Sequence, residues 1–402
     1  MKNLKQDPST AAKKGITRRE GLMLTLLSSA MVLAGCGGGG GGTTAAGDTT
    51  GGVTSGGTSA SGAITGFGSI IVGGVRFDDS AASILDDDGA DVRRGDLKLG
   101  MVVRIKGGKK SDDGTRCSAS SIEVHSELQG PIDSVTATSI VVLGQTARIS
   151  STTFFEDGLT FALLTVGTVV EVHGFVDPST NTITATRIER KTNATKFKLQ
   201  GPISALNTFA KTFNIGTLTI SYLNAELPAS LTLSNGLVVR VRLATTPLTG
   251  TRTALKIRKF ELEREDRDEA EVEGIVTAFE SKTRFSVNGL PVDASVATVP
   301  AGVVLGARVE VEGKLVNGVL VARKVELEDG DDASKFELHG LVSELDVIAK
   351  TFMLRGIKVN YSAANFSGGA TATNLANGNN VEVKGKRLDS NVILASKVSL
   401  EK

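Results

Sequence analysis

The stretch GARVEVEG, residues 306–313, alternates apolar and charged side chains between two glycines. Its two valines face one side of an extended strand, and Arg308, Glu310 and Glu312 face the other, since side chains alternate along a strand. A period of two is typical of an antiparallel strand with one face buried and one face in water. The stretch therefore predicts a half-buried β-strand.

The same pattern recurs along the chain, with small variations. Further copies are GMVVRIKG (100–107), GTVVEVHG (167–174), GLVVRVRL (236–243) and GNNVEVKG (378–385). A starting glycine precedes each copy, and an A-x-x-I/V motif follows it. The starting glycines, at positions 62, 130, 201, 274 and 340, lie 68, 71, 73 and 66 residues apart. Three landmarks in a fixed order, five times over, indicate tandem duplication.

Each repeat unit predicts a small antiparallel β-barrel. The pairs Asn288-Gly289 and Asn317-Gly318 predict two-residue hairpins, because both turn positions need positive φ. A unit then contains three meandering strands, a connector and two further strands, which is the order of an OB-type barrel. We therefore expect an all-β protein of five tandem OB-like antiparallel β-barrel modules, each able to fold alone around a modest core. A five-bladed propeller is the alternative, although propeller blades are usually shorter than these units.

The segment before the first unit predicts a flexible linker. Residues 37–61 consist mainly of Gly, Thr and Ser, with Val53 as the one large apolar residue. Such a segment cannot bury enough surface to fold, so we expect a disordered coil that spans about 27 Å on average. The predicted parts of the chain are a signal peptide (1–35), a lipidated cysteine with linker (36–61) and β-barrel repeats 1 to 5 (62–126, 127–191, 192–264, 265–328 and 329–402).

The repeat text resembles a known family. The stretch GAITGFGSIIVGGVRFD (62–78), followed by L-x-x-G-x-V-V at 97–103, resembles a bacterial repeat family catalogued as domain of unknown function 5666. The resemblance spans roughly residues 62 to 400 and is weakest in the third copy, where Leu243 replaces the final glycine. It implies small β-barrel modules on exported proteins and lipoproteins, and it implies no particular activity.

The N-terminus predicts export and a lipid anchor. Basic residues precede an apolar run from Leu22 to Leu33, which suits a signal peptide and is too short to span a bilayer. Leu33-Ala34-Gly35-Cys36 resembles the bacterial lipobox, which implies a diacylglycerol on the thiol of Cys36 and cleavage just before it. Gly37 follows the cysteine, and by the same resemblance this favours the outer membrane of a Gram-negative bacterium.

The export route is open between two alternatives. Residues 17–23, TRREGLM, resemble the twin-arginine signal, with Arg18 and Arg19 as its arginine pair. Gly21 stands where that signal usually has phenylalanine, so the general secretory route is the alternative.

Composition argues against several classes of partner and chemistry. Without residues 1–35 the chain has 39 basic and 42 acidic residues, no tryptophan and only 2 tyrosines, so we expect no nucleic-acid partner. Cys117 is the one cysteine left after Cys36, which rules out an internal disulfide. No nucleophile, phosphate-binding or dinucleotide motif occurs. The sequence therefore predicts no catalytic residue, no cofactor and no enzyme.

The histidines and the acidic run 86–91 also lack metal-site spacing. His125, His173 and His339 lie in different copies, and we expect all three at the surface rather than on zinc. The run DDDGAD does not fit a calcium loop, and we expect a solvated hairpin tip there.

Charge is distributed unevenly between copies three and four. Residues 192–264 contain ten bases and three acids, whereas residues 265–328 contain seven bases and twelve acids. One hypothesis is an anion-binding face for acidic polysaccharide or lipid phosphate; the other is docking of copy three against copy four. The candidate anion-binding residues are Arg240, Arg242, Arg252, Lys256 and Arg258.

These features favour a lipid-anchored envelope protein with no enzymatic activity, whose modules form an interaction or spacing element. Its expected partners are membrane lipid, through acylated Cys36, and an unidentified envelope protein or polysaccharide. The alternative is a glycan- or anion-binding protein that uses the basic face of repeat 3.

Overall fold

The computed structural model describes residues 57–177, 180–246, 250–260, 265–328, 335–389 and 392–401. Across these residues the protein is all-β, with two single-turn 3-10 helices, η1 (Arg94–Asp96) and η2 (Phe161–Leu163), and no α-helix. Neither of these short helices has the length or apolarity for a membrane span. The predicted signal peptide and Cys36 lie outside the described residues.

Apart from the start of β1, each strand lies within the bounds of one of the five predicted repeats. Repeat 1 contains β1 (Thr58–Ala63), β2 (Gly66–Phe67), β3 (Ile70–Val72), β4 (Val75–Asp78), β5 (Ser83–Asp86), β6 (Val102–Gly107) and β7 (Arg116–His125). Repeat 2 contains β8 (Leu128–Val135), β9 (Ser139–Val142), β10 (Gln145–Arg148), β11 (Phe154–Phe155), β12 (Val169–Asp177) and β13 (Thr182–Arg190).

The remaining repeats have the same sequence of long and short strands. Repeat 3 contains β14 (Lys196–Pro202), β15 (Ser204–Asn207), β16 (Thr212–Ile215), β17 (Leu218–Ser221), β18 (Val238–Ala244) and β19 (Arg252–Lys259). Repeat 4 contains β20 (Arg267–Ser281), β21 (Arg284–Val287), β22 (Leu290–Asp293), β23 (Arg308–Val316) and β24 (Val319–Leu327). Repeat 5 contains β25 (Lys335–Asp346), β26 (Thr351–Leu354), β27 (Ile357–Asn360), β28 (Asn365–Ser367), β29 (Asn380–Asp389) and β30 (Val392–Leu400).

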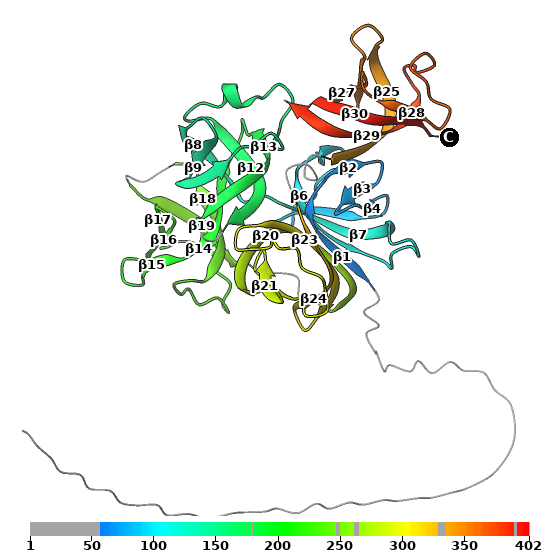
Figure 1. Ribbon diagram of the computed structural model, residues 1–402. Helices are drawn as coiled ribbons and strands as arrows, with labels where there is room; N and C mark the ends of the chain where they lie inside the picture. Colours follow the sequence, from blue (N-terminus) through cyan, green and yellow to red (C-terminus); the bar gives the residue numbers. More distant parts are fainter. Residues whose placement is uncertain are drawn as a thin grey trace, which may run out of the picture. The chain divides into compact units, whose positions relative to one another are not determined.

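Strand pairing in every repeat follows one cyclic order. In repeat 4, which is drawn in yellow in Figure 1, β20 pairs antiparallel with β21, β21 antiparallel with β22, and β22 parallel with β24. β24 then pairs antiparallel with β23, and β23 antiparallel with β20, so the order returns to its first strand. Repeat 5 has the same cyclic order, formed by β25, β26, β27, β30 and β29. In repeats 1 and 3 two consecutive strands, β1 with β2 and β14 with β15, together take the first place.

The repeats are not independent modules. β1 pairs parallel with β20, β2 pairs parallel with β25, and β8 pairs antiparallel with β14. These pairings join repeats 1, 4 and 5 in one network of 18 strands and repeats 2 and 3 in another of 12. The described residues all belong to one compact unit. The expectation of self-contained modules is therefore wrong, because strand edges that a single repeat would leave open are paired with another repeat.

β1 also begins inside the predicted linker. Thr58 to Ser61 pair with β20 on one side and with β6 on the other, and Thr58 and Ala60 are buried. Their sequence has no apolar alternation, so the order of this segment comes from hydrogen bonds to two neighbouring strands rather than from its own pattern.

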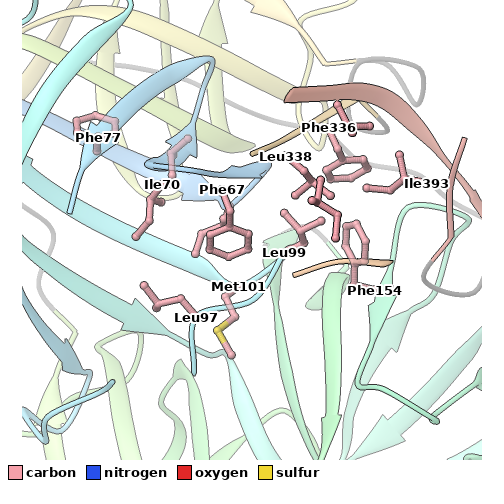
Figure 2. Close-up of a cluster of buried hydrophobic side chains, with 14 of the residues drawn as sticks. Phe67, Ile70, Phe77, Leu97, Leu99, Met101, Phe154, Phe336, Leu338 and Ile393 are labelled. Atoms are coloured by element: carbon pink, nitrogen blue, oxygen red, sulfur yellow. The ribbon is translucent and has the colours of Figure 1, made fainter. Parts of the chain in front are cut away.

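The hydrophobic cores follow the same grouping of repeats. Repeats 1 and 5 share one core, in which Leu99 lies close to Phe336 and Leu338 (Figure 2). Phe154 of repeat 2 enters this core and packs edge-on against Phe336, with ring centroids 4.8 Å apart. Repeats 2 and 3 share a second core, and repeat 4 has a third of its own.

Glycines of repeat 1 make room for side chains of repeat 4. Gly73 has φ +55°, and a Cβ there would lie 1.4 Å from Oε1 of Glu271. Glu271 is 2% exposed, and its Oε2 lies 3.1 Å from Nζ of Lys110 of repeat 1. The glycine thus allows a carboxylate of repeat 4 to lie against the backbone of repeat 1.

This contact predicts a difference between two adjacent glycine substitutions. Gly74 also has positive φ, at +77°, but a Cβ there would meet nothing within 4 Å. Gly74→Ala should cost only the left-handed backbone strain, about 1 kcal/mol. Gly73→Ala should cost a further ~1–3 kcal/mol of overpacking against Glu271. Chemical denaturation of the two variants measures this difference, and equal losses would argue against the contact between repeats 1 and 4.

Candidate functional site

A basic face lies on the outside of repeat 3, formed by β14, β18 and β19. Residue alternation sends Arg240 and Arg242 outward from β18, away from the core. The strand register places Lys198 and Lys256 on either side of Arg242, and Arg258 beside Arg240. Five cations therefore lie together on one face of three strands, four of which were predicted from the sequence.

An acidic loop of repeat 1 covers the middle of this basic face. Nη2 of Arg242 lies 2.6 Å from Oδ1 of Asp87, and its Nε lies 2.8 Å from Oδ1 of Asp88. Nζ of Lys198 lies 2.9 Å from Oδ2 of Asp87. The Asp87 side chain has no exposed surface. The loop is held in shape by Oδ1 of Asp86, which accepts the N–H groups of Asp88 and Ala90.

The ion pairs extend to repeat 2. Nζ of Lys198 lies 3.4 Å from Oε1 of Glu171, and Oε2 of Glu171 lies 2.7 Å from Nζ of Lys191. Nη2 of Arg240 lies 3.2 Å from Nδ1 of His125. A cavity of about 410 Å³ lies at this meeting point of repeats 1, 2 and 3. We call the network of Asp87, Asp88, Glu171, Lys198 and Arg242 the central junction.

The pKa values in the central junction are governed by burial and by pairing. Burial alone would raise the pKa of Asp87, but Lys198, Arg240 and Arg242 outweigh it and hold this pKa well below the ordinary 3.8. The pKa of Glu171 is likewise lowered, against its burial, chiefly by Lys198. Burial opposes the charge of Arg242, and Asp87 and Asp88 raise its pKa nevertheless. Asp87, Glu171 and Arg242 are therefore charged at neutral pH, and each lies against groups of opposite charge.

The acidic run was expected in solvent, and for Asp87 this expectation is wrong. The local sequence indicates a polar turn, which the structure contains, but the turn lies against the basic face of repeat 3. The partner of the basic face is thus repeat 1, and not the acidic repeat 4 that was one of the two hypotheses. The basic face does lie against an acidic segment of another repeat. The net charge of each repeat, however, does not show which repeat supplies that segment.

The histidines were expected at the surface, and this expectation is also wrong. His125, His173 and His339 are 8%, 1% and 7% exposed. Alternation does place His173 beside Glu171 on the polar face of β12, but another repeat covers that face. Burial, more than any neighbouring charge, lowers the pKa of His125 and of His173, so both are neutral at pH 7.

The other candidate residues have different surroundings. Lys256 lies at the edge of the basic face, with its Nζ 3.0 Å from Oε1 of Glu226, and Arg258 is exposed. Arg252 instead lies over the ring of Phe197, 5.6 Å from its centroid. Cys36, Arg18 and Arg19 fall outside the described residues.

A second charged junction joins repeats 1 and 5. Arg76 of repeat 1 forms an ion pair with Glu337 and contacts Nε2 of His339, and its Nη2 lies 3.6 Å from Oε1 of Glu382. Glu337, His339 and Glu382 have ligand atoms within 4.8 Å of one another, a spacing that could hold a metal ion. The guanidinium of Arg76 and the ammonium of Lys384, 2.9 Å from Glu337, already bring positive charge to this place.

Fold and junctions together define a class: an all-β tandem-repeat protein whose repeats are joined by strand pairing and by buried ion pairs. The chain belongs to the family described as domain of unknown function (DUF5666), which matches residues 59–123, 129–189, 273–326 and 339–399. The third repeat is outside these matches, in keeping with its divergent motif at Leu243.

Other comparisons add little. The search of curated proteins gave no match. Among solved structures, a piece of the Drosophila protein Unr, described as "drosophila Unr CSD456", is similar at 13% identity. The alignment covers 42% of this chain and 79% of that one, with a TM-score of 0.16, which is too low to support an argument about fold or function.

The central junction predicts a large effect of one carboxylate. Asp87→Asn should remove the fully buried counter-charge that Lys198 and Arg242 share, leaving them only Glu171 and Asp88, and should destabilise the protein by about 3 kcal/mol. Asp91→Asn, in the same loop but exposed, should change little. Urea denaturation of both variants measures the difference, and similar midpoints would contradict the role given to Asp87.

The pH dependence of the free energy of unfolding provides a second test of the role of Asp87. The folded-state pKa of Asp87 lies below 3.8, so its stabilisation is present above about pH 4 and is lost as the pH falls through the folded value. The Asp87→Asn variant should lack this part of the acid dependence.

Proposed function

We propose that this protein is a lipid-anchored component of a bacterial cell envelope, and that its five repeats form a non-enzymatic interaction or spacing body. The lipobox-like Leu33-Ala34-Gly35-Cys36 and the glycine-rich linker support the anchor. The observation that carries the proposed role of the body is the use of its charged side chains. In the central junction Asp87 of repeat 1 forms ion pairs with both Lys198 and Arg242 of repeat 3. Charges used in this way stabilise an assembly.

We also propose that each repeat is an OB-like barrel. The support is the cyclic pairing order, with a parallel contact between the third and fifth strand positions, such as β22 with β24 and β27 with β30. This is the strand order expected for that fold.

The lipid anchor has a direct test. When the full chain is expressed in a Gram-negative host fed an alkyne fatty acid, the protein should become labelled and should fractionate with membranes. Cys36→Ser should abolish the label and release the protein from the membrane fraction, because the thiol is the attachment atom. Cys117→Ser, which removes the buried second thiol, is the matched control and should keep the label. Labelling that survives Cys36→Ser would contradict the anchor.

A second candidate function is the binding of acidic glycans or other anions by the basic face of repeat 3. Its support is the exposed Arg258 and the partly exposed Lys256 at the edge of that face. Arg240 and Arg242, at its centre, are turned toward Asp87. The surface left for an external anion is therefore small.

The edge residues distinguish the two functions. Our leading proposal predicts that Lys256→Glu with Arg258→Glu leaves retention on a dextran sulfate column unchanged, relative to Lys282→Glu with Arg284→Glu on repeat 4. The anion-binding function requires a drop in affinity of about tenfold or more in the repeat 3 variant alone, since two charge-assisted contacts are lost. Such a drop would favour the second function.

A further inference from the structure

One hairpin of repeat 3 places a phenylalanine almost entirely in water. Phe209 lies in the turn between β15 and β16 and is 98% exposed, the largest exposed fraction among the large apolar side chains of the described residues. Burial of a phenyl ring is one of the larger apolar gains that a single side chain can make. A lone exposed apolar side chain is nevertheless common on protein surfaces. The surroundings of Phe209 therefore decide what its exposure means.

The backbone that carries the ring is fixed by hydrogen bonds. Oδ1 of Asn207 accepts the N–H groups of Phe209 and Ala210, at 3.1 and 2.8 Å. Lys211 ends the turn with φ +55°, and its carbonyl oxygen accepts the N–H of Tyr222 at 2.8 Å. An asparagine that caps its own turn in this way holds the local backbone in one conformation. The ring is thus presented on an ordered turn, so little ordering cost remains for a binding event.

The same turn occurs again in repeat 5. Oδ1 of Asp346 accepts the N–H groups of Ile348 and Ala349, both at 2.9 Å, and Lys350 has φ +58°. Ile348 takes the position of Phe209 and is 91% exposed. Two copies of one turn both direct a large apolar side chain into solvent, so the outward position is a property of the turn.

The two hairpins differ in charge. Residues 190–225 contain no aspartate or glutamate, and Lys211 brings a positive charge two positions after Phe209. The hairpin of repeat 5 instead has Glu344 and Asp346 next to its apolar tip. The hairpin of repeat 3 thus combines an apolar tip and a nearby cation with flanks that contain no carboxylate to repel an anionic surface.

We propose that this hairpin inserts Phe209 into the lipid surface to which the chain is anchored. An apolar ring below the headgroups and a cation beside their phosphates are the features by which proteins lie on membranes. The surface is within reach, because residues 37–56, between Cys36 and the first described residue, span at most about 70 Å. The inference rests on the proposed anchor and adds a second contact with the same membrane.

The anchor makes a weak insertion sufficient. A single ring gives a modest free energy of transfer, so a body free in solution would leave the membrane again. A tethered body meets the lipid at a high effective concentration, which turns a weak contact into a populated one. Insertion at Phe209 then fixes how the body is oriented, with the β15–β16 turn of repeat 3 toward the membrane.

The test uses tryptophan fluorescence, because the protein contains no tryptophan of its own. Phe209→Trp is compared with Lys282→Trp, in the exposed β20–β21 turn of repeat 4. The full chain, purified with a free thiol at Cys36, is coupled through that thiol to a maleimide lipid in phosphatidylglycerol vesicles; the other cysteine, Cys117, is buried. We expect the emission of Phe209→Trp to move to shorter wavelength and to be quenched by lipids with brominated acyl chains. The emission of Lys282→Trp should stay as it is in buffer.

Two further measurements separate insertion from other effects. Phe209→Trp should melt at the wild-type temperature, since the side chain is 98% exposed and does not support the fold. Lys211→Glu, added to Phe209→Trp, should lower the ratio of inserted to free tip roughly tenfold on phosphatidylglycerol vesicles, because a favourable charge becomes a repelled one. The same change should have a smaller effect on phosphatidylcholine vesicles, which have no net charge.

Equal emission of the two tryptophan variants on vesicles would overturn the proposal. If both stay in water, the partner of Phe209 is a pocket of another protein rather than lipid; if both are quenched, the contact is not specific to this hairpin. Neither result bears on acylation of Cys36 in cells, because the tether in this experiment is chemical and the labelling experiment tests the natural one.

Discussion

The charged side chains on the outer face of each central strand must find partners wherever another repeat covers that face. A buried charge without a counter-charge costs several kcal/mol, whereas a well-paired one is tolerated. In repeat 3 these positions hold Arg240 and Arg242, which form ion pairs with Asp87 and Asp88 of repeat 1. In repeat 5 one of these positions holds Glu382, which forms an ion pair with Arg76 of repeat 1. The need for compensation therefore selects which surfaces can meet.

This constraint explains how similar units assemble in a defined way. Their inward valines are alike, so these residues of the central strands do not by themselves distinguish one neighbour from another. The two outward side chains of the central strand differ between repeats. They are Arg and Lys in repeat 1, Glu and His in repeat 2, two arginines in repeat 3, two glutamates in repeat 4, and Glu and Lys in repeat 5. A wrong pairing of repeats would bring like charges together, which is the usual way in which duplicated surfaces stay specific. Repeat 1 pairs strands or ions with repeats 3, 4 and 5, which makes it the centre of the assembly.

Local patterns predicted local structure well. Alternation identified the buried valines of β18 and β23, and the two Asn-Gly pairs do adopt positive φ, as in Asn288 at 50° and Asn317 at 51°. The same patterns could not show that Asp87 or His173 is buried, since the covering surface comes from another repeat. Asp87 is paired with Lys198 and Arg242, which lie 111 and 155 residues further along the chain. The sequence contains one sign of this contact: Arg240 and Arg242 of repeat 3 are opposite in charge to the acidic residues of the 86–91 loop.

Hydrogen exchange measured by mass spectrometry on the intact chain tests most directly whether the repeats form one body. The account predicts that amides at the inter-repeat pairings, β1 with β20 and β8 with β14, exchange as slowly as those of the hairpin between β23 and β24 within one repeat. Fast exchange at the inter-repeat pairings, with slow exchange retained inside each repeat, would show independent modules and contradict it.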